Sequence, residues 1–388
     1  MLKQTKESFF AGLLIAIMVS GLALEVGMQI AKASSKTITV PDNYPTIQMA
    51  INSASPGDTV YVRGGIYSER IVVDKPVFLI GEDNQTTVID GSGTGTAVQI
   101  NNSNVEVANF TIRNAGISPW YGHGFPNSGF DIDRSNNITI RNNIVTNVTV
   151  GIWSYSSSNV TSISNFVSNT ITMGIIDYTC LNSEVKSNFL DNCGLVGIHL
   201  DGNSAKCEII NNIVTNCGEG IEIEKSSGNT LKENNMTDNN EGLVFSSSNE
   251  NSVEYCSIVN NSIGIDFYQS NTGNTFSHNS LITNALQVAF ESNSSSQSPS
   301  GIGSMNHWDN GVEGNYWSDY QTKYPNASEV NSSGIGNTPY VIDSNNTDYY
   351  PLLRQVAVPE FPSWIILSAF ITVTILCAVI CRKRTKLK

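Results

Sequence analysis

One short motif recurs seven times between Gly129 and Asn284, and it constrains the fold more than any other feature. Each copy begins with Gly and an apolar residue, and successive copies begin 22 or 23 residues apart, at Gly129, Gly151, Gly174, Gly197, Gly220, Gly242 and Gly264. The copies contain short alternating strands with Gly, Asn and Ser between them, and no helical period of 3.6 residues. A repeat of this length predicts a solenoid. We therefore expect an all-β fold, a right-handed parallel β-helix.

A second marker runs in step with the Gly positions. In every copy an Asn lies three residues after an apolar residue, at Asn147, Asn169, Asn192, Asn216, Asn239, Asn261 and Asn284. Strands of a sheet lie about 4.8 Å apart, so identical Asn side chains one turn apart can bond to each other. We expect these residues, Asn147 included, to form a buried ladder.

The charge distribution argues against nucleic acid as a partner. The chain has 388 residues and a formal net charge of -13, and its two ends are basic. Binding of a phosphate backbone needs clustered Lys and Arg, and no such cluster occurs between Lys36 and Arg354. Cations or neutral sugars suit this acidic middle region better.

Both ends of the chain have the composition of targeting segments. Residues 1–33 combine two Lys, an apolar run and a small-x-small cleavage motif, which is typical of a signal peptide, with an uncleaved anchor helix as the alternative. Residues 359–381 contain nineteen consecutive uncharged residues and form a transmembrane or sorting segment, followed by a basic cytoplasmic tail at 382–388. We expect an exported cell-surface protein, anchored to the membrane by its C-terminus.

The region between these ends divides into three parts. Residues 34–128 hold an N-terminal cap and the first turns, and Pro45 begins a short amphipathic helix that covers the open end of the core. Residues 129–290 are the regular repeats. Residues 291–358 combine a Ser-rich linker with an aromatic and acidic module, which we expect to close the coil without adding a further turn.

Alternation on the strand after each Gly predicts two columns of outward-facing, exposed residues. The apolar residue after Gly points inward, so the next residue and the one two positions later point outward. One column, the Asp131 column, contains Asp131, Trp153, Ile176, His199, Glu222, Val244 and Asp266. The other, the Asp133 column, contains Asp133, Tyr155, Tyr178, Asp201, Glu224, Ser246 and Tyr268. Asp177 points inward, which predicts a local bulge.

Acids and aromatic rings on one face suit a sugar ligand, because rings stack on pyranoses and carboxylates bond to hydroxyls. The substrate-binding candidates are Asp131, Asp133, Trp153, Tyr155, Tyr178, Asp266, Tyr268 and, on a loop over this face, Trp120. The catalytic candidates are His199, Asp201, Glu222 and Glu224. Asp201 and Glu224 should lie about 5 Å apart at Cβ, and glycoside hydrolysis requires such a carboxyl pair. The alternative is an ordinary solvated sheet face.

The sequence specifies no cofactor. Five acids of the closing module could hold calcium, although turns and a cap also explain them: Asp309, Glu313, Asp319, Asp343 and Asp348. Copper is disfavoured, because the four His residues lie far apart in turn order. Cys193 and Cys217 should stack one turn apart, either as a disulfide or as two small buried side chains.

The repeats resemble those of the NosD-like family, called periplasmic copper-binding in its name, and of the wider carbohydrate-binding and sugar-hydrolase β-helix group. Residues 46–73 look like the N-terminal cap of pectin-lyase-like β-helices. WDNGVEGNYWSDY and GIGNTPYVID look like the closing segment of archaeal NosD-like surface proteins, and PEFPSW is similar to a PEF-type C-terminal signal. The resemblance implies an archaeal envelope protein.

Three functions follow from these observations. The first is a cell-surface protein that binds glycans or envelope polymers in a structural or adhesive role. The second is a polysaccharide lyase or glycoside hydrolase that acts on the acidic and aromatic face. The third is a copper-related periplasmic protein of the NosD-like kind.

Overall fold

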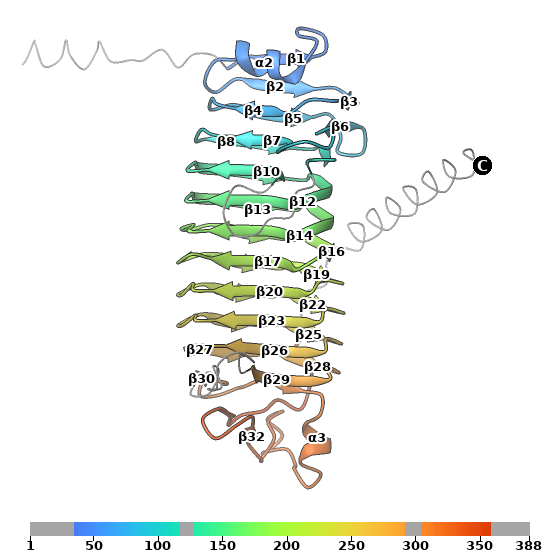
Figure 1. The fold of residues 1–388 in the computed structure, drawn as a ribbon. Coiled ribbons are helices and arrows are strands. Elements are labelled where there is room, and N and C mark those ends of the chain that lie inside the picture. Colours follow the sequence, from blue (N-terminus) through green and yellow to red (C-terminus); the bar gives the residue numbers. More distant parts are fainter. Residues whose placement is uncertain (1–34, 117–126, 292–303, 358–388) are drawn as a thin grey trace, which may run out of the picture. The chain divides into compact units, whose positions relative to one another are not determined.

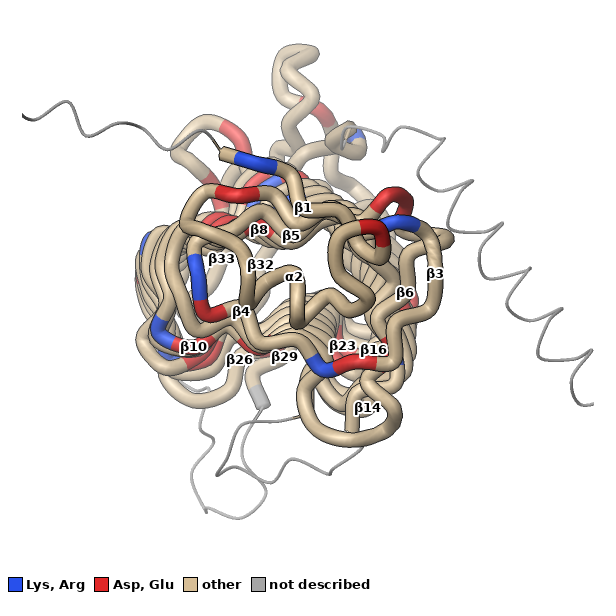
Figure 2. Tube along the Cα trace, turned by 90° about the horizontal axis from the view of Figure 1, so that it is seen from above, with Lys and Arg blue, Asp and Glu red and all other residues tan. Residues whose placement is uncertain are grey.

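The computed structural model describes residues 35–116, 127–291 and 304–357. The chain divides into two units, Met1–Lys36 and Thr37–Lys388, and the description below concerns the second. This unit is the expected parallel β-helix, in which strands stack turn upon turn (Figure 1). Seen along the coil axis in Figure 2, successive turns superimpose.

One side of the coil is a 12-stranded parallel sheet to which each turn adds one strand. Its strands are β1 (Thr37–Val40), β2 (Thr59–Val62), β5 (Phe78–Gly81), β8 (Val105–Ala108), β11 (Asn136–Arg141), β13 (Ser158–Ile163), β15 (Glu184–Lys186), β18 (Glu208–Ile210), β21 (Thr230–Lys232), β24 (Ser252–Glu254), β27 (Thr272–Ser277) and β30 (Met305–His307).

The other two sides form a 19-stranded sheet, because β12 (Ile144–Tyr155) and β14 (Phe166–Tyr178) run through the corner between them. One side consists, besides these, of β4 (Ile71–Val73), β7 (Val98–Ile100), β10 (Ser128–Asp133), β17 (Val196–Asp201), β20 (Glu219–Glu224), β23 (Glu241–Ser246), β26 (Ile263–Tyr268) and β29 (Leu286–Glu291). The other consists of β3 (Gly65–Tyr67), β6 (Thr87–Asp90), β9 (Thr111–Arg113), β16 (Phe189–Cys193), β19 (Ile213–Thr215), β22 (Asn235–Thr237), β25 (Ser257–Val259), β28 (Ser280–Ile282) and β31 (Tyr316–Trp317).

The repeated Gly marks the place where successive turns approach most closely. A Cβ atom on Gly129 would lie 2.7 Å from the carbonyl oxygen of Gly151, and each of the other repeat glycines up to Gly242 would meet the next one in the same way. Real Cβ atoms do not come this close to a backbone oxygen. Only Gly fits, which explains why the motif recurs once per turn.

Inside one corner, an Asn ladder satisfies the buried backbone. The ladder consists of Asn143, Asn165, Asn188, Asn212, Asn234, Cys256, Asn279 and Asn315, all buried. The backbone N–H of Asn165 donates to Oδ1 of Asn188 at 2.9 Å, and Nδ2 of Asn165 donates to the carbonyl of Ile140 on the preceding turn. Each Asn therefore ties three turns together.

The predicted burial of the ladder through Asn147 is wrong for the first four turns, although the side chain of Asn192 donates to that of Asn169 at 2.8 Å. Asn147, Asn169, Asn192 and Asn216 are exposed and have φ between 53° and 55°. The residue after each of them, Val148, Thr170, Cys193 or Cys217, points inward and is buried. Of the seven Asn residues predicted from the sequence, only Asn239, Asn261 and Asn284 are buried and form a ladder. Asn occurs in both neighbouring columns because it tolerates a left-handed backbone as well as a ladder position.

The expected cap helix is present as α2 (Ile47–Ser53). The hydroxyl of Thr46 accepts a hydrogen bond from the N–H of Met49, which caps the first turn. Ile47, Ala50 and Ile51 are fully buried against the first turn of the coil. The helix therefore covers the apolar end of the solenoid.

The closing module begins with a further partial turn, which corrects the expectation from the sequence. Strands β30 and β31 pair in parallel with β27 and β28. The chain then leaves the coil through α3 (Tyr320–Lys323) and the antiparallel pair β32 (Tyr340–Val341) and β33 (Thr347–Asp348). Trp308 and Trp317 are almost completely buried under the last turn, so they close the core.

The structure corrects the prediction for Asp177 and decides between the two alternatives for Cys193 and Cys217. Asp177 is buried without a bulge, since it pairs in register with Ser154 and Leu200. The irregularity in this region lies between Val148 and Val150 instead. Cys193 and Cys217 are buried free thiols, so no disulfide joins them.

The predictions for the two ends lie outside the described residues. This applies to the signal segment 1–33, the segment 359–381, the tail 382–388 and Trp120. Among the helices of residues 35–116, 127–291 and 304–357, none has the length and apolarity needed to cross a membrane. The domain boundaries drawn from the sequence stay predictions.

Candidate functional site

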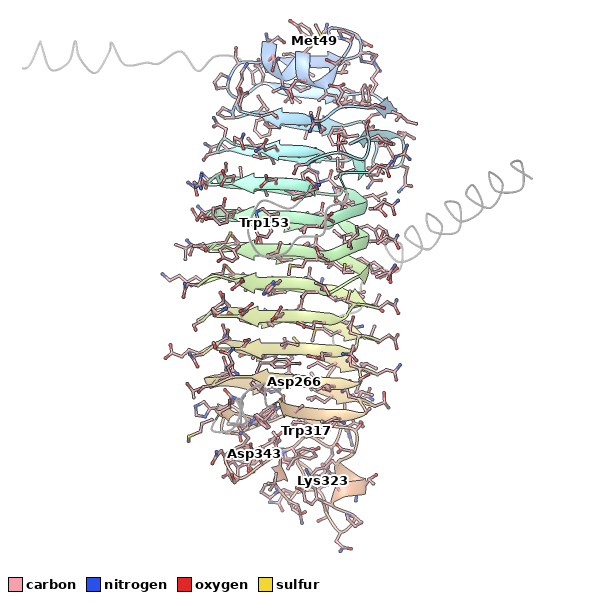
Figure 3. The ribbon with its side chains drawn as sticks, in the orientation of Figure 1. Met49, Trp153, Asp266, Trp317, Lys323 and Asp343 are labelled. Atoms are coloured by element: carbon pink, nitrogen blue, oxygen red, sulfur yellow. The ribbon has the colours of Figure 1, made fainter. Side chains whose placement is uncertain are left out.

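The two predicted columns exist and lie in register on the outer face of β10, β12, β14, β17, β20, β23 and β26. Asp131 pairs with Trp153, Trp153 with Ile176, Ile176 with His199, and His199 with Glu222. Trp153 and Asp266, labelled in Figure 3, lie near the two ends of this column. The sequence thus predicts which side chains share the face.

A third column, which sequence reasoning missed, lies beside the Asp131 column. This Val150 column contains Val150, Met173, Val196, Glu219, Glu241 and Ile263. Its members precede the repeat Gly by one position, as Glu219 precedes Gly220. That offset was readable in the sequence and could have identified Glu219 and Glu241.

The predicted exposure of the Asp131 column is wrong. Asp131, Trp153 and His199 are each only 4% exposed, and Asp266 is fully buried. The Asp131 column is the middle one of three, so the Val150 and Asp133 columns flank it on both sides. The face is therefore a packed surface in which Tyr155, Tyr178, Asp201 and Glu224 are half-buried.

The turns nearest the N-terminus make up the apolar part of this face. Val150, Trp153, Met173, Ile176 and Val196 form a buried cluster on the outside of the coil, with Tyr155 and Tyr178 packed against it. The rings of Tyr155 and Tyr178 are stacked, with centroids 5.7 Å apart, and the guanidinium of Arg134 lies 5.5 Å over the Tyr155 ring. The Tyr155 ring is thus in contact with both Tyr178 and Arg134 within the protein.

The next turns make up the acidic part, which consists of His199, Asp201, Glu219, Glu222, Glu224 and Glu241. Nε2 of His199 lies 3.2 Å from Oε2 of Glu222 and 3.7 Å from Oε2 of Glu224. Neither contact has hydrogen-bond geometry, and within the described residues neither ring nitrogen of His199 has a hydrogen-bond partner. The other carboxylate oxygen of Glu224 pairs with Lys225.

Burial dominates the protonation of this part. It lowers the pKa of His199 to about 4, against the opposing effect of Glu224. Burial and then the neighbouring carboxylates raise the pKa of both Glu219 and Glu222 well above the usual range. Burial followed by Glu224 also raises the pKa of Asp201. The acidic part thus combines a neutral imidazole with protonated and ionised carboxyls.

The C-terminal end of the face is occupied by contacts within the protein. The hydroxyl of Tyr268 donates to both carboxylate oxygens of Glu241 at 3.3 Å. Asp266 is fully buried beside Val244 in the same column. Asp266 therefore presents no open surface to a ligand, whereas Tyr268 is half-buried with its hydroxyl bonded within the protein.

A pocket of about 580 Å³ lies at the N-terminal end of the Asp131 column. Its lining consists of Arg70, Ile71, Val72, Thr96, Gln99 and Asp131. Gln99 pairs in register with Asp131 and with Val72, so the column continues into the pocket. Burial, followed by the charge of Asp133, raises the pKa of Asp131 to about 6. Its Oδ1 has no hydrogen-bond partner among the described residues.

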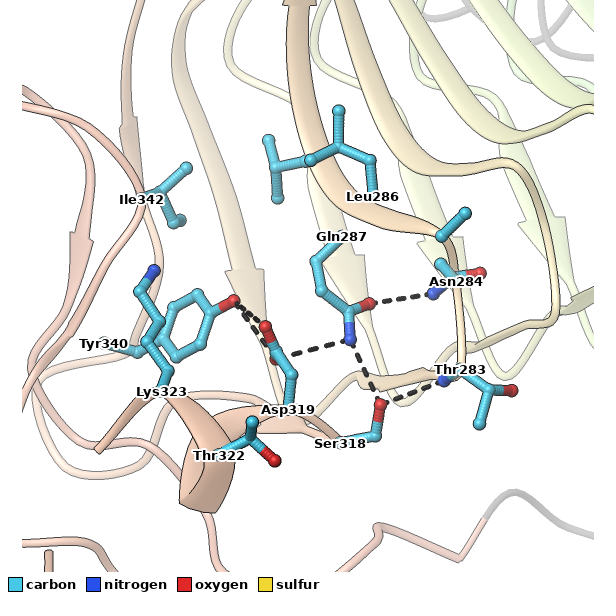
Figure 4. A pocket seen from close by; sticks show the side chains of 12 residues that line it. Thr283, Asn284, Leu286, Gln287, Ser318, Asp319, Thr322, Lys323, Tyr340 and Ile342 are labelled. Carbon is cyan, nitrogen blue, oxygen red and sulfur yellow. Dashed lines mark hydrogen bonds between the residues drawn. The ribbon is translucent and has the colours of Figure 1, made fainter. Parts of the chain in front are cut away.

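A second pocket, of about 570 Å³, lies between the last turn and the closing module (Figure 4). The hydroxyl of Tyr340 donates to Oδ2 of Asp319 at 2.9 Å, and the Gln287 amide donates to Ser318 at 3.1 Å. Lys323 lies 4.0 Å over the Tyr340 ring. These polar groups make hydrogen bonds and contacts with one another. The residues around the pocket therefore connect the closing module to the last turn of the coil.

The five acids considered for calcium in the closing module are engaged in the same manner. Asp348 accepts hydrogen bonds from Asn315, Trp317 and Tyr350. Asp309 and Asp343 accept from backbone N–H groups of nearby turns. Glu313 lies 2.7 Å from His278. The turn and cap interpretation therefore explains these residues.

Comparisons with known proteins agree with this architecture. The family model described as periplasmic copper-binding protein (NosD) matches residues 126–322, slightly more than half of the chain. No curated protein matches the sequence.

Solved structures share the fold at low sequence identity. The A-module of mannuronan C-5 epimerase AlgE6 from Azotobacter vinelandii is 20% identical with a TM-score of 0.55, over 70% of this chain and 81% of that one. The catalytic unit of a GH87 alpha-1,3-glucanase from Streptomyces thermodiastaticus is 15% identical with a TM-score of 0.53, over 73% and 70%. An alginate lyase from Paenibacillus sp. is 11% identical with a TM-score of 0.50, over 66% and 97%. These similarities show the fold alone.

Proposed function

Because the chain belongs to the NosD family, we propose that it is an exported cell-envelope protein that binds a glycan on the outer face of its coil. Residues 359–381 would anchor it to the membrane and leave the coil outside the cell. The binding role is structural or adhesive. The archaeal origin and the PEF-type signal belong to the same proposal.

The observation that carries the proposal is the pocket at the N-terminal end of the Asp131 column. Its volume of about 580 Å³ is within the range of small-ligand sites. The guanidinium of Arg70 donates, the carboxyl of Asp131 accepts and the amide of Gln99 does both. Sugar hydroxyls also donate and accept, so a sugar ring can satisfy all three groups at once.

The fold relatives add support of a general kind. By their descriptions, the epimerase acts on mannuronan, the glucanase on an alpha-1,3-glucan and the lyase on alginate. All three therefore handle polysaccharides on a related coil. The strand columns of this chain offer a polymer several adjacent contact points along the axis.

A glycan array with the full-length protein tests the proposal. We expect a hit whose affinity falls about tenfold in Arg70→Gln and in Asp131→Asn, because each variant leaves a polar group of the ligand unpaired. Arg63→Gln is the matched control, since Arg63 pairs with Asp42 and does not line the pocket. An empty array, or a hit that both pocket variants bind as tightly as the wild type, would refute glycan binding here.

A second candidate function is polysaccharide cleavage by a lyase or hydrolase. It is favoured by one observation, the position of His199 within 3.2 Å of Glu222 and beside Asp201 and Glu224. An acid and a base in such proximity suit proton transfer to and from a sugar. Product analysis on every array hit decides the matter. Cleavage that Glu222→Gln abolishes while binding persists would establish the enzyme.

The family description names copper, and in the form of Cu(I) this metal fits the described residues poorly. Cu(I) is selected by thiolate and thioether ligands. The one group of His, Cys, Asp and Glu in the described residues that is arranged to hold a metal contains no sulfur. His278 lies elsewhere, stacked on Tyr255 and paired with Glu313.

A further inference from the structure

We propose that His199, Asp201 and Glu224 bind a divalent metal ion of the borderline class represented by Zn²⁺ and Co²⁺. The proposal goes beyond glycan binding. A metal site in the acidic part does not depend on a ligand in the pocket lined by Arg70, Gln99 and Asp131, which we call the Arg70 pocket. Copper(I) and calcium are the competing ions.

The first argument is geometric. His199 and Asp201 lie on β17 and Glu224 lies on β20, one turn further on. One ligand atom from each residue lies within 4.8 Å of the other two. A Zn²⁺ ion binds N and O ligands at about 2.0 to 2.2 Å, so its ligands lie about 3 to 4 Å from one another. Small side-chain rotations would close this set around an ion.

The second argument is the state of His199. The residue is 4% exposed, and both of its ring nitrogens lack a hydrogen-bond partner within the described part of the chain. Buried polar atoms nearly always have a partner. Nε2 lies 3.2 Å from Oε2 of Glu222 and 3.7 Å from Oε2 of Glu224, and neither contact has hydrogen-bond geometry. A cation between the imidazole and the carboxylates would satisfy all of them.

The surrounding charge supports a cation at this position. Asp201 and Glu224 each use one oxygen elsewhere, Asp201 for the N–H of Gly202 and Glu224 for Lys225, which leaves the second oxygen of each for an ion. Lys225 is the basic side chain paired here, and its side chain is 57% exposed.

The donor set selects the class of metal. Calcium takes six to eight oxygen ligands and gains nothing from an imidazole. Copper(I) prefers sulfur, which these residues do not supply. One imidazole with two carboxylates matches the mixed N and O sites of zinc, in which open positions remain for water or substrate.

Titration of the full-length, metal-free protein with Co²⁺ tests the proposal. We expect a visible d–d absorption band that saturates at one equivalent and disappears when Zn²⁺ is added. His199→Asn should weaken binding by more than about tenfold, because losing even an outer-shell partner of a metal ligand costs 10- to 100-fold. Asp201→Asn, at a half-buried position, tests the same site with less risk to folding.

Glu208→Gln is the matched control, since Glu208 lies in the 12-stranded sheet and is exposed. Its binding should equal that of the wild type. The proposal is overturned if no band develops, if His199→Asn and Asp201→Asn bind as tightly as the control, or if only copper binds. Glycan binding measured on the same variants separates the two proposals, because the Arg70 pocket is intact in each of them.

Discussion

The apolar and acidic parts of the outer face have the same backbone arrangement and differ in their side chains. Both stand on consecutive parallel strands with the same columns and the same register. One part packs Val150, Trp153 and Ile176 into a cluster, whereas the other places His199 among carboxyls. One column of the inner face does not change between them, as Ile175, Ile198 and Ile221 are all fully buried. The interior specifies the coil, so the exterior columns are free to vary.

The largest effect should come from the apolar part. Trp153→Ala should lower the free energy of unfolding by about 3 to 5 kcal/mol, because it leaves a cavity in a buried cluster. Urea denaturation measures the loss. His199→Ala, two turns on in the same column, should cost much less, since His199 has no hydrogen bond to lose. Equal losses would mean that the two parts do not differ in their contribution to stability.

Asp177 sharpens the comparison, because it is a carboxyl inside the coil beneath the apolar part. Burial raises its pKa from 3.8 to about 6, and the nearby polar groups are Ser154 and the thiols of Cys180 and Cys207. The folded state therefore keeps the proton up to about pH 6, whereas the unfolded state releases it above about pH 4. The contribution of Asp177 to stability is therefore fully present below pH 4 and is lost as the pH rises through 6.

Asp177→Asn should remove this dependence. A shift of about two pKa units corresponds to about 3 kcal/mol, so the variant should gain up to that amount over the wild type at pH 8 and almost nothing at pH 4. Urea midpoints at pH 4, 6 and 8 provide the measurement. A difference between variant and wild type that is the same at all three pH values would contradict the assignment.

The smallest change in the free energy of unfolding should come from replacing an acidic residue of the acidic part with an apolar one, as in the apolar part. Glu222→Leu places an apolar side chain between His199 and Val244 in the column, so it should raise the free energy of unfolding by about 1 to 3 kcal/mol. Thermal unfolding of this variant and of Glu222→Gln measures the gain. A destabilised Glu222→Leu would show that the acidic part contributes to the fold.

The sequence predicts the coil and the columns well, because both depend on spacing alone. The Gly period follows from a backbone approach that excludes any Cβ, and the alternation of β-strands places Asp131, Trp153 and His199 in one line. Both rules depend only on the backbone and need no knowledge of the packing between columns.

The burial of residues on the outer face could not be predicted from the spacing of residues in the sequence. The middle column is covered because side chains of two other columns flank it, and the Val150 column precedes the Gly from which the pattern was counted. The Asn147 ladder failed because Asn fits two adjacent positions for different reasons, a left-handed turn and an inward hydrogen bond. The Arg70 pocket joins Asp131 of the first repeat to residues from turns that precede the regular repeat.

The Asn ladder has one further consequence, which concerns the length of the molecule. Each N–H needs an acceptor on the next turn, and Asn315 finds it in Oδ2 of Asp348 at 2.8 Å. A carboxyl group accepts this hydrogen bond and has no amide that must donate onward, so Asp348 ends the series. Except at Cys256, the turns from Asn143 to Asn315 offer the same bond from a backbone N–H to the Asn Oδ1 of the next turn. Duplicating or deleting a whole turn would leave both caps with compatible partners, and this gives such a gene a simple way to lengthen or shorten its product.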